Sequence, residues 1–135
     1  MRKHAMPISV LLADDTAIMR KAVCSILDSR SDLVVVGEAT DFAATMHLIE
    51  TLRPNVVVMD LHMPGECKIS PADVKSQLRK ATSRMVAISI WHDDDARALA
   101  DSFGAVALLS KIDILNTLVP AILDLSRPKV LVAAS

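Results

Sequence analysis

The amino-acid sequence predicts an α/β fold of one domain, in which a doubly wound five-stranded parallel sheet is covered by helices on both faces. Two observations predict it. Short apolar runs alternate with segments of helical periodicity from residue 8 to residue 126, a pattern typical of consecutive βα units. The 135 residues are 52% hydrophobic and 23% charged, which indicates a chain with one packed core rather than a disordered one.

The first two βα units are expected before residue 54. Residues 8–13 are almost entirely apolar, as in a strand that is buried on both faces. Asp15-Thr16 offers an N-cap for a helix that continues to about residue 29. Leu33–Val36 is the expected second strand, closed by Gly37, and Thr40-Asp41 caps the second helix.

The middle of the chain continues the alternation. Pro54 ends the second helix, and Val56–Met59 forms the third expected strand. After a loop, a weaker helical pattern covers about residues 72–80, and the fourth strand is centred on Val86–Ile88. Sheet strands of this apolar kind belong in the interior of the sheet.

The last two helices enclose the fifth expected strand. Asp93 caps a helix that Gly104 stops from the C-terminal glycine position. The fifth strand is expected over residues 105–109, and Asp113 opens the fifth helix. Pro120 within that helix removes one backbone hydrogen bond, so we expect a local kink.

Composition argues against several classes of function. The 15 basic and 16 acidic side chains nearly cancel, which is unlike a protein that grips a DNA backbone. Only 2% of the residues are aromatic, too few for stacking against single-stranded nucleic acid. The three glycines form no Gly-rich phosphate loop. No run approaches the roughly 18 apolar residues of a membrane span, so we expect a cytoplasmic protein without membrane contact.

Polar side chains stand where the expected strands end. Asp14-Asp15 follows the first strand, Asp60 the third, Ser89 lies in the fourth and Lys111 follows the fifth. Singly, each fits a structural role as a cap, a turn residue, a small strand residue or a solvated charge. Together they should meet at one sheet edge, where carboxylates suit Mg²⁺ and a lysine suits an anionic oxygen. This set predicts a phosphoryl site, with Asp60 as the candidate nucleophile.

The sequence combines the paired acids Asp14-Asp15 with the run from Val57 to Gly65, Ser89 and Lys111. In this combination it resembles the receiver domain of bacterial two-component response regulators, a CheY-like domain with a flavodoxin-like fold. The intervals between Asp60, Ser89 and Lys111 are close to those usual in the family. The resemblance covers residues 8–126. It leaves residues 1–7 as an N-terminal tail and residues 127–135 as a C-terminal tail or an extra edge segment.

The resemblance implies a role for each matching residue. The chain would be a single-domain receiver, with Asp60 as the acceptor of a phosphoryl group from a histidine kinase or a phosphotransfer protein. Ser89 and Lys111 would each bond a phosphoryl oxygen. The implied Mg²⁺ ligands are Asp15 and Asp60 directly, Asp14 through water, and the backbone carbonyl of His62.

The chain departs from the family pattern at several positions. Leu108 stands where the family usually has an aromatic switch residue, and Ile112 stands where a proline commonly follows the lysine. Trp91 admits two interpretations, a core residue or an anchor for a partner. The resemblance implies signalling through protein contacts with an unidentified target, leaves a homodimer open, and implies no direct nucleic-acid binding.

Other functions remain open at the level of sequence. One alternative is a Mg²⁺-dependent aspartyl-phosphate hydrolase, although His62 stands where such enzymes usually have a second aspartate. Others are the receiver fragment of a longer DNA-binding regulator, a flavodoxin-like electron carrier, and a receiver that is not phosphorylated. Beyond self-phosphorylation from small donors and slow autodephosphorylation, we expect no enzymatic activity.

Overall fold

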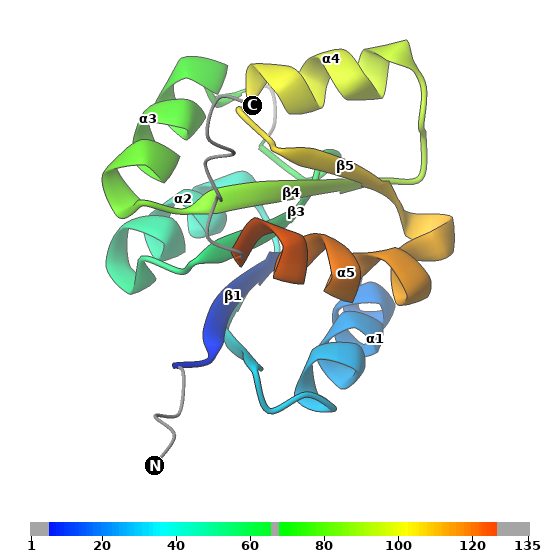
Figure 1. Cartoon of the computed structure of the whole chain (residues 1–135). Coiled ribbons are helices and arrows are strands. Elements are labelled where there is room, and N and C mark those ends of the chain that lie inside the picture. The colour runs from blue at the N-terminus through cyan, green and yellow to red at the C-terminus, as the bar shows by residue number, and fades with distance from the viewer. Residues whose placement is uncertain (1–5, 66–67, 127–135) are drawn as a thin grey trace, which may run out of the picture.

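The computed structural model describes residues 6–65 and 68–126, and in this part of the chain five parallel strands form one sheet in the order β2-β1-β3-β4-β5. Helices connect the strands, so the doubly wound α/β prediction is confirmed (Figure 1). The elements are β1 (Ile8–Ala13), α1 (Ala17–Asp28), β2 (Leu33–Ala39), α2 (Phe42–Leu52), β3 (Val56–Asp60), α3 (Pro71–Ala81), β4 (Arg84–Ser89), α4 (Asp94–Ser102), β5 (Ala107–Ser110), the 3₁₀ helix η2 (Lys111–Asp113) and α5 (Ile114–Ser126).

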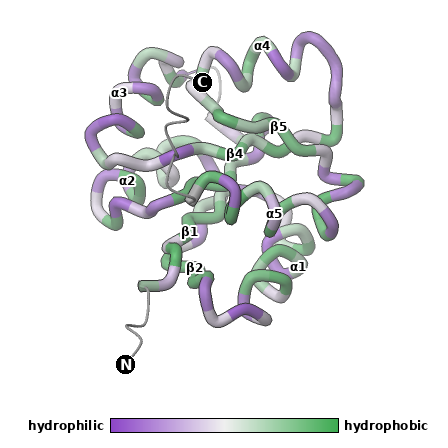
Figure 2. Tube along the Cα trace, in the orientation of Figure 1, coloured by the Kyte–Doolittle hydropathy of each residue, from purple (hydrophilic) through white to green (hydrophobic). Residues whose placement is uncertain are grey.

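Two hydrophobic cores lie on opposite faces of the sheet, because successive strand residues point to opposite sides. In β1, Leu11 packs with residues of α2, α3 and α4, whereas Leu12 packs with residues of α1 and α5. All five residues of the central strand β3 are buried. The strands are accordingly hydrophobic, whereas the helices alternate hydrophobic and hydrophilic residues along their length (Figure 2).

The expected end of the second strand at Gly37 is wrong. β2 continues to Ala39, and its pairing with β1 shifts register so that Gly37 lies opposite Leu11. The lack of a side chain matters there, since a Cβ atom at Gly37 would lie 2.8 Å from Leu52 Cδ1. Gly37 therefore makes room for α2 within the strand instead of ending it.

The expected bounds of the last strand and the last helix also need correction. β5 begins at Ala107 and ends at Ser110, the residues that pair with β4 from Val86 to Ser89. Asp113 does not open α5 but closes η2, the turn that begins at Lys111 and connects β5 to α5. The helix continues through Pro120.

The caps expected for α2 and α4 are confirmed. Asp41 accepts a hydrogen bond from Ala44 N at 2.7 Å, and Asp93 accepts one from Ala96 N at 2.9 Å. Gly104 adopts a φ of 81° just beyond α4, the left-handed conformation expected of a helix-ending glycine. Within the described residues, no helix is both long and apolar enough to cross a membrane.

Candidate functional site

The structure brings the predicted site residues together at the carboxyl edge of the sheet. Asp14 follows β1 and is fully buried, and Asp60 is the last residue of β3 and is 3% exposed. Ser89 ends β4 and is buried, whereas Asp15 is exposed. The parallel topology explains the convergence, because neighbouring strands finish at the same edge.

Lys111 joins two of these carboxylates. Its Nζ atom lies 2.9 Å from Asp60 Oδ2 and 2.9 Å from Asp14 Oδ2, and its side chain is only 11% exposed. The contact with Asp60 is a hydrogen bond. The contact with Asp14 is an ion pair, and Asp14 Oδ2 receives no well-aligned hydrogen bond. One cation thus faces two buried carboxylates.

Backbone amides hold the other oxygen of each carboxylate. Thr16 N donates to Asp14 Oδ1 at 2.8 Å, and His62 N donates to Asp60 Oδ1 at 3.0 Å. Thr16 occupies the N-cap position of α1, although its side chain makes no capping hydrogen bond. Both carboxyl groups are consequently fixed in orientation.

Burial and charge shift the pKa values of the central pair. Burial raises the pKa of Asp60, and the nearby carboxylate of Asp14 acts in the same direction. The amide of His62 and the ammonium of Lys111 oppose that rise without cancelling it. Burial by itself lowers the pKa of Lys111, but its contacts with Asp14 and Asp60 outweigh burial and raise it. The edge is therefore short of positive charge.

The acidic cluster fits a small divalent cation. Asp14, Asp15 and Asp60 each offer a carboxylate oxygen, and these oxygens lie within 4.8 Å of one another. Hard oxygen ligands with one solvent-facing member, here Asp15, suit a metal that retains several water molecules. The poorly satisfied Asp14 Oδ2 is a further indication that the edge accommodates a second cation beside Lys111.

Trp91 is not a core residue, so that interpretation is wrong. The residue is 58% exposed on the segment between β4 and α4. Its backbone amide donates to Ser89 Oγ at 3.0 Å.

Leu108, in the position of the family's aromatic switch, is partly buried against the core under α2, α3 and α4. Ile112 is 82% exposed, and no cis peptide bond occurs among the described residues.

Sequence reasoning missed Arg20. Its guanidinium donates to Asp14 O at 2.8 Å and pairs with Glu38 Oε1 at 3.2 Å. These contacts tie the start of α1 and the end of β2 to the segment that carries Asp14. A basic residue within an amphipathic helix gives no sequence signal of such a contact, since the pairing depends on how α1 packs.

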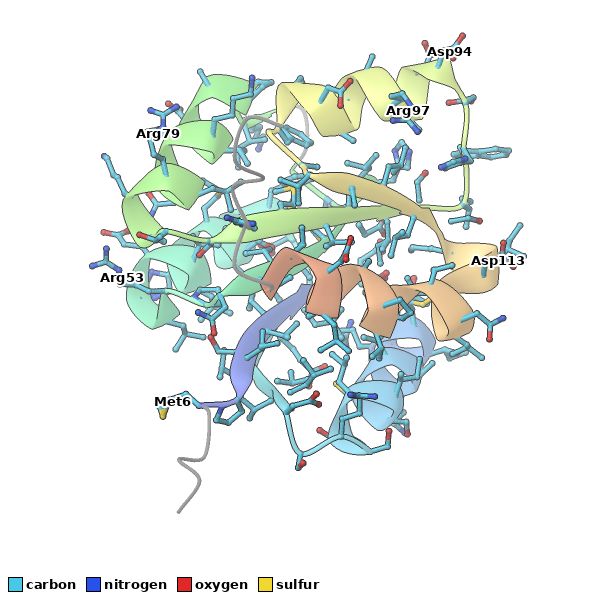
Figure 3. The ribbon with its side chains drawn as sticks, in the orientation of Figure 1. Met6, Arg53, Arg79, Asp94, Arg97 and Asp113 are labelled. Atoms are coloured by element: carbon cyan, nitrogen blue, oxygen red, sulfur yellow. The ribbon has the colours of Figure 1, made fainter. Side chains whose placement is uncertain are left out.

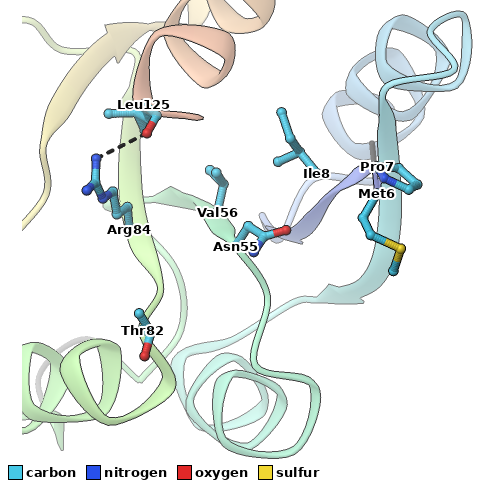
Figure 4. Close-up of a pocket in the computed structure, with 8 residues that line it drawn as sticks. All are labelled: Met6, Pro7, Ile8, Asn55, Val56, Thr82, Arg84 and Leu125. Atoms are coloured by element: carbon cyan, nitrogen blue, oxygen red, sulfur yellow. Dashed lines mark hydrogen bonds between the residues drawn. The ribbon is translucent and has the colours of Figure 1, made fainter. Parts of the chain in front are cut away.

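A cavity of about 430 Å³ lies at the opposite edge, where β1, β3 and β4 begin (Figure 4). Its lining includes Ile8, Asn55 and Leu125 but no carboxylate side chain. Its one charged side chain, Arg84, donates to Leu125 O at 3.1 Å. The titratable cluster, and not this cavity, is therefore the candidate functional site.

Comparison with known proteins agrees with the geometry. The profile of the response regulator receiver domain matches residues 10–122. The protein-glutamate methylesterase/protein-glutamine glutaminase of Nitrosomonas europaea is 33% identical over 113 residues, which are 82% of this chain and 32% of that protein. The chain spans 30–48% of the length of the first curated relatives that it matches.

Solved structures show the same fold. The signal receiver domain of the putative response regulator NarL from Mycobacterium tuberculosis superposes with a TM-score of 0.77 at 30% identity, covering 89% of this chain and 96% of that one. The structure of the P1 domain of CheA3 in complex with CheY6 from R. sphaeroides contains a chain with a TM-score of 0.72 at 21% identity, covering 90% of this chain and 98% of that one.

Proposed function

This chain belongs to the response regulator receiver domain family, and from that premise we propose that Asp60 accepts a phosphoryl group from a phosphohistidine of a sensor kinase or phosphotransfer protein. The observation that carries the assignment to this residue is the placement of its carboxylate. Asp60 ends the central strand, contacts Lys111 at 2.9 Å and adjoins two further aspartates. Asp14 also has a held carboxylate and contacts Lys111, but Asp60 ends the strand that lies between the strands of Asp14 and Ser89.

The proposed transfer breaks the bond between phosphorus and the donor imidazole nitrogen. A carboxylate oxygen of Asp60 forms the new bond to phosphorus, and the electron pair of the broken bond stays on the imidazole nitrogen, which takes up a proton. Asp60 must be ionised to attack. Lys111 favours that form, because an ammonium at 2.9 Å stabilises the charged carboxylate.

Lys111 and Ser89 have separate proposed roles in holding the transferred group. Lys111 pairs with one phosphoryl oxygen, since its raised pKa keeps the ammonium charged at neutral pH. Ser89 donates the proton of its hydroxyl to another oxygen, while its lone pairs still accept from Trp91 N. Both side chains stand at the carboxyl edge, because Ser89 ends β4 and Lys111 directly follows β5, the two strands that come after β3 in the sheet.

We further propose that Asp15 and Asp60 bind Mg²⁺ directly, that Asp14 binds it through water, and that the backbone carbonyl of His62 completes the protein ligands. The ion would supply positive charge next to the phosphoryl oxygens. In the part of the chain that the structure describes, Lys111 is shared between Asp14 and Asp60, and this sharing supports the assignment. The chain presents these oxygens at the sheet edge, where two backbone amides hold the carboxylates of Asp14 and Asp60 in place.

The phosphorylated domain would signal through protein contacts in the cytoplasm, either alone or as a homodimer. We assign the receiver to residues 8–126, with residues 1–7 and 127–135 as tails. The receiver of a longer DNA-binding regulator is an equally compatible setting, because the curated relatives are longer. We assign no enzymatic activity beyond self-phosphorylation from small donors and slow autodephosphorylation.

The test is phosphorylation by acetyl phosphate in the presence of Mg²⁺, followed by intact mass. We expect one phosphoryl group on the wild type and on the control Asp28→Asn, and none on Asp60→Asn. Asp28 ends α1 and is exposed, so its substitution matches the chemical change outside the site. Modification of Asp60→Asn would refute the assignment, and rapid turnover of phosphate esters would favour the hydrolase.

A further inference from the structure

A second hollow, of about 300 Å³, lies beside the segment that joins β4 to α4. It is lined by His62, Trp91, Asp93, Asp95, Ala96 and Leu99. We call it the β4–α4 pocket. Its volume is at the lower limit of pockets that hold drug-sized ligands, so one or two side chains of a partner fit it better than a small molecule.

The apolar part of this pocket is open to contact. Trp91 is 58% exposed and its neighbour Ile90 is 55% exposed. Leu99 is partly buried against the core and Ala96 is buried beneath it. Tryptophan is enriched among the residues that dominate binding energy at protein interfaces. An exposed indole beside aliphatic groups thus offers both an aromatic face and a surface for methylene groups.

The charged part of the pocket is acidic. Asp93 and Asp95 contribute the carboxylates that line it, and Asp94 lies outside the pocket at the start of α4. The N-terminus of a helix supplies only about half a positive charge, so the carboxylates of Asp93 and Asp95 outweigh it. Asp93 Oδ1 is engaged by Ala96 N as the helix cap. The resulting surface repels a phosphate and attracts a cation.

We propose that the β4–α4 pocket binds an arginine side chain displayed by a protein partner. A guanidinium stacks on the face of an indole and pairs with carboxylates. Its aliphatic stem can lie against Leu99 and Ala96. This inference deepens the proposed signalling function by naming the chemistry of the partner, and it rests on that function only for the biological role of the contact.

The pocket is also connected to the phosphoryl site. Trp91 N donates to Ser89 Oγ at 3.0 Å, and Ser89 is the residue proposed to hold a phosphoryl oxygen. Reorientation of that hydroxyl would alter the support of the Trp91 backbone. An arginine bound to the indole would accordingly respond to phosphorylation of Asp60 through the side chain of Ser89. This connection does not require an aromatic residue at position 108, which is Leu108 in this chain.

The test uses blocked arginine amide as the probe and blocked citrulline amide as its neutral isostere. Because Trp91 is the only tryptophan in the chain, its fluorescence and indole NMR signal report on the pocket. We expect saturable binding of the arginine probe on the order of millimolar, and binding of citrulline at least about 5-fold weaker.

Matched variants separate the pocket from general charge. Asp95→Asn should weaken binding of the arginine probe about 3-fold or more. Trp91→Leu should weaken binding further, and because this variant has no indole its titration is followed through the backbone amide signals in NMR. Asp94→Asn should leave binding unchanged, since Asp94 does not line the pocket and points outward from the end of α4 (Figure 3).

The proposal is overturned if the indole signal shows no saturable shift up to about 50 mM probe, or if citrulline binds as well as arginine. Equal effects of Asp94→Asn and Asp95→Asn would also overturn it. The titration uses the unphosphorylated protein. Failure of Asp60 to accept a phosphoryl group therefore leaves its outcome intact, and the two proposals fail separately.

Discussion

Lys111 Nζ lies 2.9 Å from Asp60 Oδ2 at the carboxyl edge of the sheet. The same nitrogen is 2.9 Å from Asp14 Oδ2, so a single ammonium compensates two buried carboxylates. A lysine that follows the edge strand β5 reaches the end of the central strand β3 in this way. Stability, metal affinity and phosphorylation should all depend on that shared cation.

Replacing Lys111 by Gln should destabilise the metal-free protein by about 3 kcal/mol, because removal of one partner leaves buried charge uncompensated. Urea unfolding with and without Mg²⁺ measures the effect. We expect Mg²⁺ to restore a large part of the loss. Lys80→Gln is the control, since Lys80 is an exposed lysine on α3. Equal stability of the two variants would contradict the role of Lys111.

The stability of Asp60→Asn relative to the wild type should depend on pH. Burial raises the pKa of Asp60 in the folded protein above the value of about 3.9 in the unfolded chain. Between these two values the folded state binds more protons, so wild-type stability falls as pH rises. The stability of the Asn variant does not fall for this reason, because its side chain does not titrate.

The stability advantage of Asp60→Asn should therefore be larger at about pH 7 than at about pH 4 in the absence of metal. Denaturant unfolding at several pH values measures it, and saturating Mg²⁺ should reduce the advantage. An advantage that shrinks as pH rises would show that Asp60 has a lowered pKa.

Asp15→Asn should weaken Mg²⁺ binding about 10-fold or more, because the site loses one of three carboxylates. The change should leave stability almost unaltered, since Asp15 is exposed. Isothermal titration calorimetry measures the affinity, and Asp28→Asn serves as a control of equal charge. Unchanged Mg²⁺ affinity in Asp15→Asn would remove this residue from the metal site.

Ser89→Ala should reduce the change in Trp91 fluorescence on addition of Mg²⁺ and beryllofluoride, because it removes the oxygen that accepts from Trp91 N. We expect a reduction of about half or more, with Mg²⁺ affinity preserved. Ser110→Ala is a matched control. Ser110 pairs with Ser89 across the β4–β5 ladder, and its hydroxyl accepts from Ile112 N instead.

Gly104→Ala should destabilise the fold by about 1 kcal/mol or more, since alanine is strained at a positive φ. A Cβ atom there would also lie 3.0 Å from Lys75 Cγ. Gly37→Ala should cost less, because the atom that it meets is the end of the partly exposed Leu52 side chain. Thermal unfolding compares the two, and the opposite order would refute the argument.

Much of the fold could be predicted from local patterns. The apolar run of β3 and the caps at Asp41 and Asp93 are encoded by neighbouring residues, so their positions follow from the sequence. The end of β2 could not be predicted in this way. Gly37 is a common stop signal, but the shifted pairing with β1 and the packing of Leu52 keep it within the strand.

The sequence alone determined which residue types stand at the ends of the strands, and parallel topology made their convergence predictable for Asp14, Asp60, Ser89 and Lys111. Tertiary structure alone decided that Lys111 pairs with both buried carboxylates. It also decided that Trp91 lies exposed beside an acidic pocket. The physical reason is that polarity alternates locally along a strand or helix, whereas pairing and exposure depend on segments that are distant in sequence.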